Sequence, residues 1–281
     1  MSAYTISLLS VIGINVMLAV SLNIISGFCG QISLGHGAFY GAGAYAAALV
    51  AVGTGQLALA LGVGAVTGAL LGVIVGFASL RVRTDFLAVT TIGVNFLFTG
   101  IVRKQGWLGG EMGISNIPSS GLGAFGNMVM IEAFALATIA LSLYLDASWM
   151  GFAFRAVAED EDAAATLSIS GPAYKLIAFG IGTALAGLAG GLYAYFTQFI
   201  TVDAFDFITS VMLLAMVVIG GMGSTLGVTA AAIVLTLLPE LFRFVNEYRL
   251  LVFGGLLVLI IRLAPGGLAQ AVRAGVARFA R

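Results

Sequence analysis

Long apolar stretches alternate with short polar segments along almost the whole chain. A helix needs about 20 apolar residues to cross roughly 30 Å of hydrocarbon. The stretches that meet or nearly meet this length lie at 4–26, 33–52, 57–79, 86–102, 128–146, 174–197, 207–240 and 249–264. Each is predicted to be membrane-spanning and helical, which predicts an all-α polytopic membrane protein with about eight to ten transmembrane helices.

The number of spans depends on the stretch 207–240, which contains the segment Gly220-Gly221-Met222-Gly223-Ser224. If this segment is a turn, the sequence predicts nine spans, and if it is a break inside one helix, it predicts eight. Pro172, Pro239 and Pro265 lie just before or at the ends of predicted spans. A missing amide hydrogen is tolerated there, so the prolines agree with this division of the chain.

Composition supports the same class of protein. Hydrophobic residues make up 60% of the chain and charged residues 9%, whereas a soluble domain contains about 25% charged residues. The balance of 12 basic and 12 acidic residues argues against a nucleic-acid-binding surface. The single cysteine, Cys29, excludes an intrachain disulfide and is predicted to be a small buried side chain.

The basic residues predict the orientation in the membrane. Placing the loop 155–175 and the tail 265–281 in the cytoplasm also places Arg81 there in the nine-span arrangement, although Arg103 and Arg243 then face outward. No Lys or Arg precedes Arg81, so the first apolar stretch lacks the basic region of a signal peptide and is predicted to remain as a span. The N-terminus is then predicted to lie outside.

Ionisable residues are predicted to be absent from the middle of the spans. Asp85, Glu132, Asp146 and Arg262 fall near predicted span ends, and the polar groups at depth are instead Asn15, Asn23 and Asn95. Ion-coupled carriers generally need an intramembrane ionisable group, and no G-x-x-x-x-G-K-[S/T] loop occurs in this chain. Energy for uphill transport is therefore expected from a separate nucleotide-hydrolysing partner. We expect no catalytic residue, no enzyme activity and no metal site in this chain.

One polar segment, within 155–175, stands out because Glu159-Asp160-Glu161-Asp162 precedes three alanines. It predicts a short charged helix on one side of the membrane that contacts a soluble partner. Arg155 and Glu159 are spaced to pair along it. The residues expected to share one face that fits a groove are Ala156, Asp160, Ala163, Ala164 and Leu167. The alternative is a solvated loop helix.

Two further regions are candidates for the transport pathway. Gln31, Ser33 and His36 surround a membrane boundary and are predicted gate or boundary groups, with structural hydrogen bonding as the alternative. Asn95 lies near the middle of the stretch 86–102 and is the leading candidate for pathway lining. Its alternative role is an amide bonded to a neighbouring helix, since an unpaired amide is costly in hydrocarbon.

Glycine patterns mark an external loop and tight helix packing. The segment 109–118 is polar and Gly-rich, and predicts an outward docking or gating loop with Glu111, Ser115 and Asn116, or else a plain connector. Gly64, Gly68, Gly72 and Gly76 recur every fourth residue in one stretch, a pattern that lets helix backbones approach closely.

Several motifs together closely resemble the permeases of branched-chain amino acid ABC importers. The first, G-Q-I-S-L-G-H-G, begins the segment 30–45 and is similar to the LivM-type member of this family rather than the LivH-type member. The other matching segments are 109–118, 155–164, 174–179, 184–194, 215–224 and 238–243. The resemblance extends from about residue 10 to residue 268.

The resemblance implies one permease domain over 1–281, with a coupling loop at 155–171 and a cytoplasmic tail at 265–281. It also implies a multi-pass protein of the bacterial inner membrane, paired with a second, LivH-type permease. Two cytoplasmic ATPases would bind ATP and Mg²⁺, and an extracytoplasmic binding protein would deliver the solute; this chain is expected to bind no cofactor. Two departures from the family pattern are Ser168, where Gly is usual, and Glu111, which follows the glycine pair.

The solute follows less directly from the resemblance. Permeases of this type carry leucine, isoleucine and valine, other amino acids, urea, short amides or aromatic acids. A self-sufficient facilitator or channel is a competing class, but it leaves the acidic helix without a role, and a purely structural membrane subunit is a third alternative.

Overall fold

The computed structural model describes residues 2–80 and 84–241, together with positions 252, 254, 255, 258, 259, 262 and 267. The α-helices are α1 (Ala3–Asn23), α2 (His36–Thr54), α3 (Leu57–Ser79), α4 (Thr84–Lys104), α5 (Gly123–Ala147), α6 (Trp149–Glu159), α7 (Glu161–Thr166), α8 (Gly171–Thr197), α9 (Phe207–Gly220) and α10 (Thr225–Leu241). A π-helical turn, η1 (Ile24–Phe28), extends α1, and the 3₁₀ turns are η2 (Gly106–Leu108), η3 (Gly110–Met112) and η4 (Val202–Phe205).

Seven helices in the described part of the chain are long and apolar enough to cross a membrane. Their ranges are Ala3–Phe28, His36–Thr54, Leu57–Ala78, Phe86–Lys104, Gly123–Ala147, Gly171–Thr197 and Val202–Gly220. The predicted all-α polytopic class is confirmed. The predicted span 249–264 and the tail 265–281 lie outside the continuous described ranges, so the total number of spans stays a prediction.

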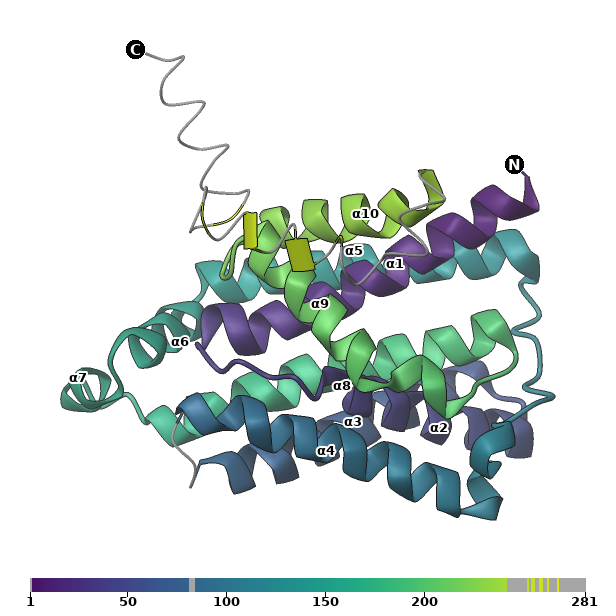
Figure 1. Ribbon diagram of the computed structural model, residues 1–281, viewed down its shortest axis with the longest axis horizontal. Helices are drawn as coiled ribbons and strands as arrows, with labels where there is room; N and C mark the ends of the chain where they lie inside the picture. The colour runs from purple at the N-terminus through teal and green to yellow at the C-terminus, as the bar shows by residue number, and fades with distance from the viewer. Residues whose placement is uncertain are drawn as a thin grey trace, which may run out of the picture.

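The helices form two groups, which meet where α1 packs against α8 and where α9 crosses between them (Figure 1). In one group α2, α3 and α8 pack against one another, with α4 beside α2; in the other, α1 packs against α5 and α10. The N-terminus and the connection from α4 to α5 lie at one end of the molecule, and α6 and α7 lie at the opposite end (Figure 1). The loops 109–118 and 155–171 are thus at opposite ends, as the nine-span arrangement requires.

Backbone-to-backbone packing holds the first group together. A Cβ atom on Gly43 of α2 would lie 2.2 Å from Cα of Gly187 on α8, and one on Gly68 of α3 would lie 2.3 Å from the carbonyl oxygen of Thr183. These distances leave no room for a side chain. The predicted role of the glycine stripe in close helix packing is confirmed.

The Gly-rich segment 220–224 is a turn. α9 ends at Gly220, and Gly221 and Gly223 take positive φ angles of 101° and 83°, a conformation that suits glycine. α10 then packs back against α9, so a Cβ on Gly220 would lie 2.5 Å from Cα of Val228. The stretch 207–240 therefore forms two separate helices joined by a turn, and not one helix with an internal break.

The depth predicted for Glu132 is wrong. α5 begins at Gly123, before the predicted start of the span at residue 128, and Glu132 therefore lies well inside a helix of 25 residues. Its Oε1 atom is buried and has no hydrogen-bond partner among the described residues, while Gly13 of α1 faces it. The first five residues of α5 include Gly123, Gly126 and Asn127, which are typical of a loop in a sequence pattern.

Candidate functional site

The acidic segment folds as two helices rather than one. We call residues 149–169 the α6–α7 corner. α6 ends at Glu159, Asp160 is extended with φ −158° and ψ 112°, and α7 begins at Glu161. Asp160 Oδ1 accepts hydrogen bonds from the amides of Asp162 (2.9 Å) and Ala163 (3.0 Å). This carboxylate therefore caps the start of α7, a position that favours negative charge.

The structure corrects three predictions for this segment. A single face cannot contain residues on both sides of the break at Asp160, because α6 and α7 do not share one helical register. Arg155 pairs with Asp146 rather than with Glu159. Ala164 is 2% exposed and packs inside this chain in an apolar cluster with Phe154 and other side chains, so it does not face a partner.

The remaining predicted coupling residues are presented to the outside. Glu159, Ala163 and Leu167 are exposed, and Leu167 is 67% exposed although it is apolar. Glu161 instead forms an ion pair with Lys175 at the start of α8. Ala163 lies on α7 and Leu167 is the residue that caps its C-terminal end, so the two place exposed apolar side chains on and directly after this short helix.

The loop before α2 connects the α6–α7 corner to the interior. Gln31 Nε2 donates to the carbonyl oxygen of Lys175 at 3.2 Å. Gly30, with φ 68°, packs so closely on α6 that an added Cβ would lie 3.1 Å from the Cβ of Ala158. Gln31 is 3% exposed and Ser33 is 0% exposed. Both lie inside this chain, and their predicted role as gate groups remains a prediction.

His36 and Asn95 belong to a buried polar network. The Ser21 hydroxyl donates to the carbonyl oxygen of Leu18, so His36 Nε2, 2.8 Å from that hydroxyl oxygen, is the donor in their hydrogen bond. Asn95 Nδ2 donates to Ser210 Oγ on α9 at 3.2 Å. These contacts are those of the structural alternatives considered for both residues, and a role in the pathway stays a prediction.

The loop 109–118 is anchored by apolar residues and presents polar ones. Ile114 and Ile200 exchange two backbone hydrogen bonds, of 2.9 and 3.1 Å, and Ile117 is buried. The predicted polar groups are exposed: Glu111, Ser115 and Asn116. Docking or gating by this loop stays a prediction, with a plain connector as the alternative.

A cavity of about 590 Å³ lies between α1, α9 and α10. Its lining includes exposed residues such as Tyr4 and Glu240 at the end of the molecule that contains the N-terminus, and buried residues such as Leu18 and Tyr40 at depth. The cavity therefore opens toward that end. None of the predicted site residues lines it.

Sequence reasoning missed this cavity because the described residues that line it come from six separate elements. One signal was present. Asn15 was recognisable as a polar group at depth, and it lines the cavity and donates to Thr236 Oγ1 at 3.0 Å. No group of three or more His, Cys, Asp or Glu side chains able to hold a metal ion occurs within the described ranges.

Comparison with known proteins places the chain in a family. The profile described as branched-chain amino acid transport system / permease component matches residues 4–261. The high-affinity branched-chain amino acid transport system permease protein LivM of Escherichia coli (strain K12) is 34% identical over 301 residues, covering 96% of this chain and 71% of that protein. The LivM protein of Salmonella typhimurium is 35% identical, covering 92% and 68%.

A second type of relative also matches. The high-affinity branched-chain amino acid transport system permease protein LivH of Escherichia coli (strain K12) is 28% identical over 284 residues, covering 90% of each chain. No solved structure matches this chain significantly.

Proposed function

Because this chain belongs to the family of branched-chain amino acid transport system permease components, we propose that it is one of two permease subunits of an ATP-driven importer. One observation carries this proposal: the chain matches both LivM and LivH of one organism, over 96% and 90% of its length. Both relatives are named as permease proteins of a high-affinity branched-chain amino acid transport system. The greater identity is to LivM, so this chain is the LivM-type member and a LivH-type permease is its partner.

The proposed transport is the uptake of branched-chain amino acids across the bacterial inner membrane. The multi-pass helical fold supports a membrane location. One permease domain, 1–281, contributes its part of the pathway, and the chain itself catalyses no reaction.

We assign ATP and Mg²⁺ binding to two separate cytoplasmic ATPases, which dock at the coupling loop 155–171. Exposed Ala163 and Leu167 offer an apolar contact, and exposed Glu159 lies beside it. Movement of α7 is transmitted to α8 through the ion pair between Glu161 and Lys175, and onward to the loop before α2 through Gln31.

An extracytoplasmic binding protein is the proposed partner of the opposite end. The loop 109–118 presents Glu111, Ser115 and Asn116 on a backbone fixed by Ile114. The Glu111 carboxylate adds a negative charge that a basic side chain of the binding protein would complement.

The test is ATP hydrolysis by the purified four-subunit membrane complex in nanodiscs. We expect the binding protein loaded with leucine to stimulate hydrolysis at least several-fold, and the unloaded binding protein to have a smaller effect. If the rate of ATP hydrolysis is the same with loaded binding protein as with no binding protein, the importer assignment is contradicted and an autonomous facilitator is favoured. Stimulation by a binding protein loaded only with urea, a short amide or an aromatic acid would reassign the solute.

A further inference from the structure

Acidic side chains line part of the cavity between α1, α9 and α10, and no described basic side chain lines it. Its lining includes Asp203, Asp206 and Glu240, and no described Lys, Arg or His. Asp203 already has a cationic partner, because it forms an exposed ion pair with Arg103 at 2.8 Å. The cavity is therefore suited to a positively charged group and unsuited to a simple anion.

In two of these carboxylates only one of the two oxygen atoms accepts a hydrogen bond from a described residue. Asp206 uses Oδ1 to cap α9, accepting from the amide of Thr209 at 2.8 Å and from its hydroxyl at 3.0 Å. Glu240 uses Oε2 to accept from the Tyr4 hydroxyl at 2.8 Å. Among the described residues, no hydrogen bond occupies Asp206 Oδ2 or Glu240 Oε1, so both remain able to accept from a solute.

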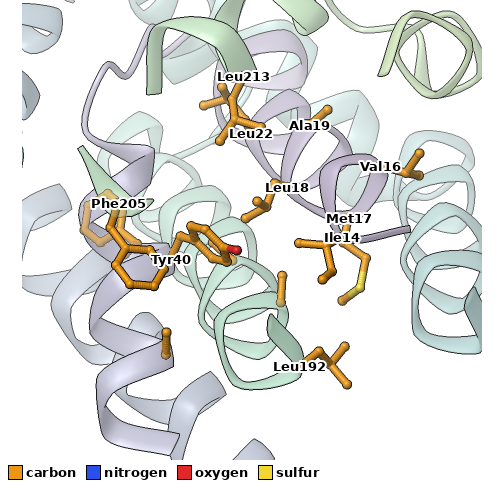
Figure 2. Packing of buried hydrophobic residues seen from close by; sticks show 14 of the residues in the cluster. Ile14, Val16, Met17, Leu18, Ala19, Leu22, Tyr40, Leu192, Phe205 and Leu213 are labelled. Atoms are coloured by element: carbon orange, nitrogen blue, oxygen red, sulfur yellow. The ribbon is translucent and has the colours of Figure 1, made fainter. Parts of the chain in front are cut away.

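Tyr40 supplies the observation that points to a ligand. Its side chain is only 4% exposed, it lines the cavity, and its hydroxyl has no hydrogen-bond partner among the described residues. The hydroxyl points toward Leu18 of α1 (Figure 2). The side chain is held by packing while its hydroxyl borders the cavity, so this donor is available to a polar group of a ligand, or to water in its absence.

Asp206 and Tyr40 line the same part of the cavity. The ring of Phe205, the residue before Asp206, packs against the ring of Tyr40 with centroids 4.8 Å apart. A Cβ on Gly37, one turn before Tyr40, would lie 2.9 Å from the Asp206 carbonyl oxygen. An accepting carboxylate and a donating hydroxyl are thus held by one rigid contact between α2 and the start of α9.

Much of the remaining wall is apolar, with the Asn15–Thr236 pair and the Ser7 and Thr209 hydroxyls as its polar interruptions. Leucine and methionine side chains from α1, α9 and α10 surround this polar pair: Leu8, Leu18, Met212, Leu213, Met216 and Leu235. Such a wall favours an aliphatic side chain.

We propose that this cavity is a receiving site for the solute on this subunit, at the end that contains the N-terminus. It binds an amino-acid zwitterion with the ammonium group on Asp206, the carboxylate on the Tyr40 hydroxyl and an aliphatic side chain against the apolar wall. Glu240 and Tyr4 form the outer rim and attract the ammonium group. This assignment rests on the proposed function, and it selects neutral aliphatic amino acids over urea and over aromatic acids, whose carboxylate Asp206 would repel.

Thermal unfolding of the permease–ATPase complex in nanodiscs, without binding protein, tests the assignment. We expect leucine to raise the Tm of the wild-type complex. We expect 4-methylpentanoate, which keeps the side chain and carboxylate but lacks the ammonium group, to leave it unchanged. An absence of any leucine effect on the wild type would overturn the proposal.

Two substitutions locate the site. Asp206→Asn keeps a side chain able to cap α9 but removes the charge, and we expect it to abolish the leucine shift. Tyr40→Phe keeps the packed ring and should reduce the shift at least threefold. The matched control is Tyr45→Phe, because Tyr45 is also buried with an unpartnered hydroxyl but does not line the cavity.

The outcomes separate this inference from the proposed function. If leucine-loaded binding protein stimulates ATP hydrolysis while both variants keep the full leucine shift, the importer assignment stands and the receiving site is wrong. If the loaded binding protein has no effect on hydrolysis, the proposed function fails and the inference fails with it. Loss of the shift in Tyr45→Phe as well would also contradict a site at Tyr40.

Discussion

Asp160 and Ser168 determine the shape of the α6–α7 corner, one at each end of α7. Asp160 breaks the helix and caps the next one, whereas Ser168 ends α7 with φ 62°. The serine itself takes the left-handed conformation, so the turn lies at the position where the resemblance leads us to expect glycine. The amide of Ile169 then bonds back to the carbonyl oxygen of Ala164 at 3.1 Å.

Ser168→Gly should therefore stabilise the protein. A residue with a Cβ pays a steric cost in the left-handed region that glycine avoids, and glycine's greater freedom in the unfolded chain offsets part of the gain. We expect a net increase of about 0.5–1 kcal/mol in the free energy of unfolding, measured by denaturant titration in detergent. Ser168→Ala is the control and should give no gain; equal stability of all three proteins would show that the turn is unstrained.

Single residues also explain which parts of the site were predictable. The exposure of Glu111, Ser115 and Asn116 followed from their place in a polar Gly-rich segment. The burial of Ala164 could not be predicted, because the three neighbouring alanine positions are alike in sequence and do not indicate which one packs against the protein. The isolated amide of Asn95 suggested a pathway group, but only the position of α9 reveals that Ser210 satisfies its Nδ2.

Among the elements, the long apolar spans were predictable and the short helices were not. About 20 apolar residues in succession have few alternatives to a spanning helix, and the first six predicted spans correspond to α1 to α5 and α8. The break between α6 and α7 depends on one side chain bonding to two amides, which an Ala-rich charged pattern does not indicate. The start of α5 was missed because its first residues include Gly123, Gly126 and Asn127, and Glu132 was therefore placed too near the membrane surface.

The structure of α7 gives a sharper test of coupling than the sequence did. Ala163→Arg and Leu167→Asp alter the two exposed apolar side chains and should each lower stimulated ATP hydrolysis at least fivefold, with normal assembly of the permease pair. Ala164→Trp should instead impair assembly, because that side chain is buried within this chain. The matched control is Ala165→Arg, on a different side of the same helix, which should stay within twofold of wild type. Full stimulation in Ala163→Arg and Leu167→Asp would remove α7 from the docking surface.

For the whole molecule, the account requires the loop 109–118 and the α6–α7 corner to face opposite sides of the membrane. In a Cys29→Ala background, cysteines at Ser115 and at Ser168 are both at exposed positions. An impermeant maleimide should label the first from outside intact cells and the second only from the cytoplasmic side of inverted vesicles. Labelling of both from one side would refute the arrangement.

Cys29 itself provides the background control for that experiment. Its thiol is 2% exposed, and burial raises its pKa to about 11. The raised pKa keeps the thiol protonated at pH 7, and the reactive thiolate gains population only as the pH approaches that value. The unaltered protein should therefore show no maleimide labelling from either side at pH 7.

The way the helices pack around the cavity could not be predicted from the sequence. Asn15, Tyr40, Asp206 and Thr236 are far apart in the chain and meet in one cavity only because α1, α2, α9 and α10 pack around it. Residues with no common motif form such a cavity, so pattern reasoning cannot assemble it. The glycine contacts between α2, α3 and α8 fix the group of helices from which Tyr40 projects.

Accumulation of leucine against its own concentration gradient tests the central claim most directly. Proteoliposomes containing the complete importer, with loaded binding protein outside and ATP inside, should concentrate radiolabelled leucine above its external level. They should not do so without ATP or with ATPase subunits inactivated by substitution. Leucine that merely equilibrates across the membrane at the same rate with and without ATP would contradict the account, because a facilitator would then explain the transport.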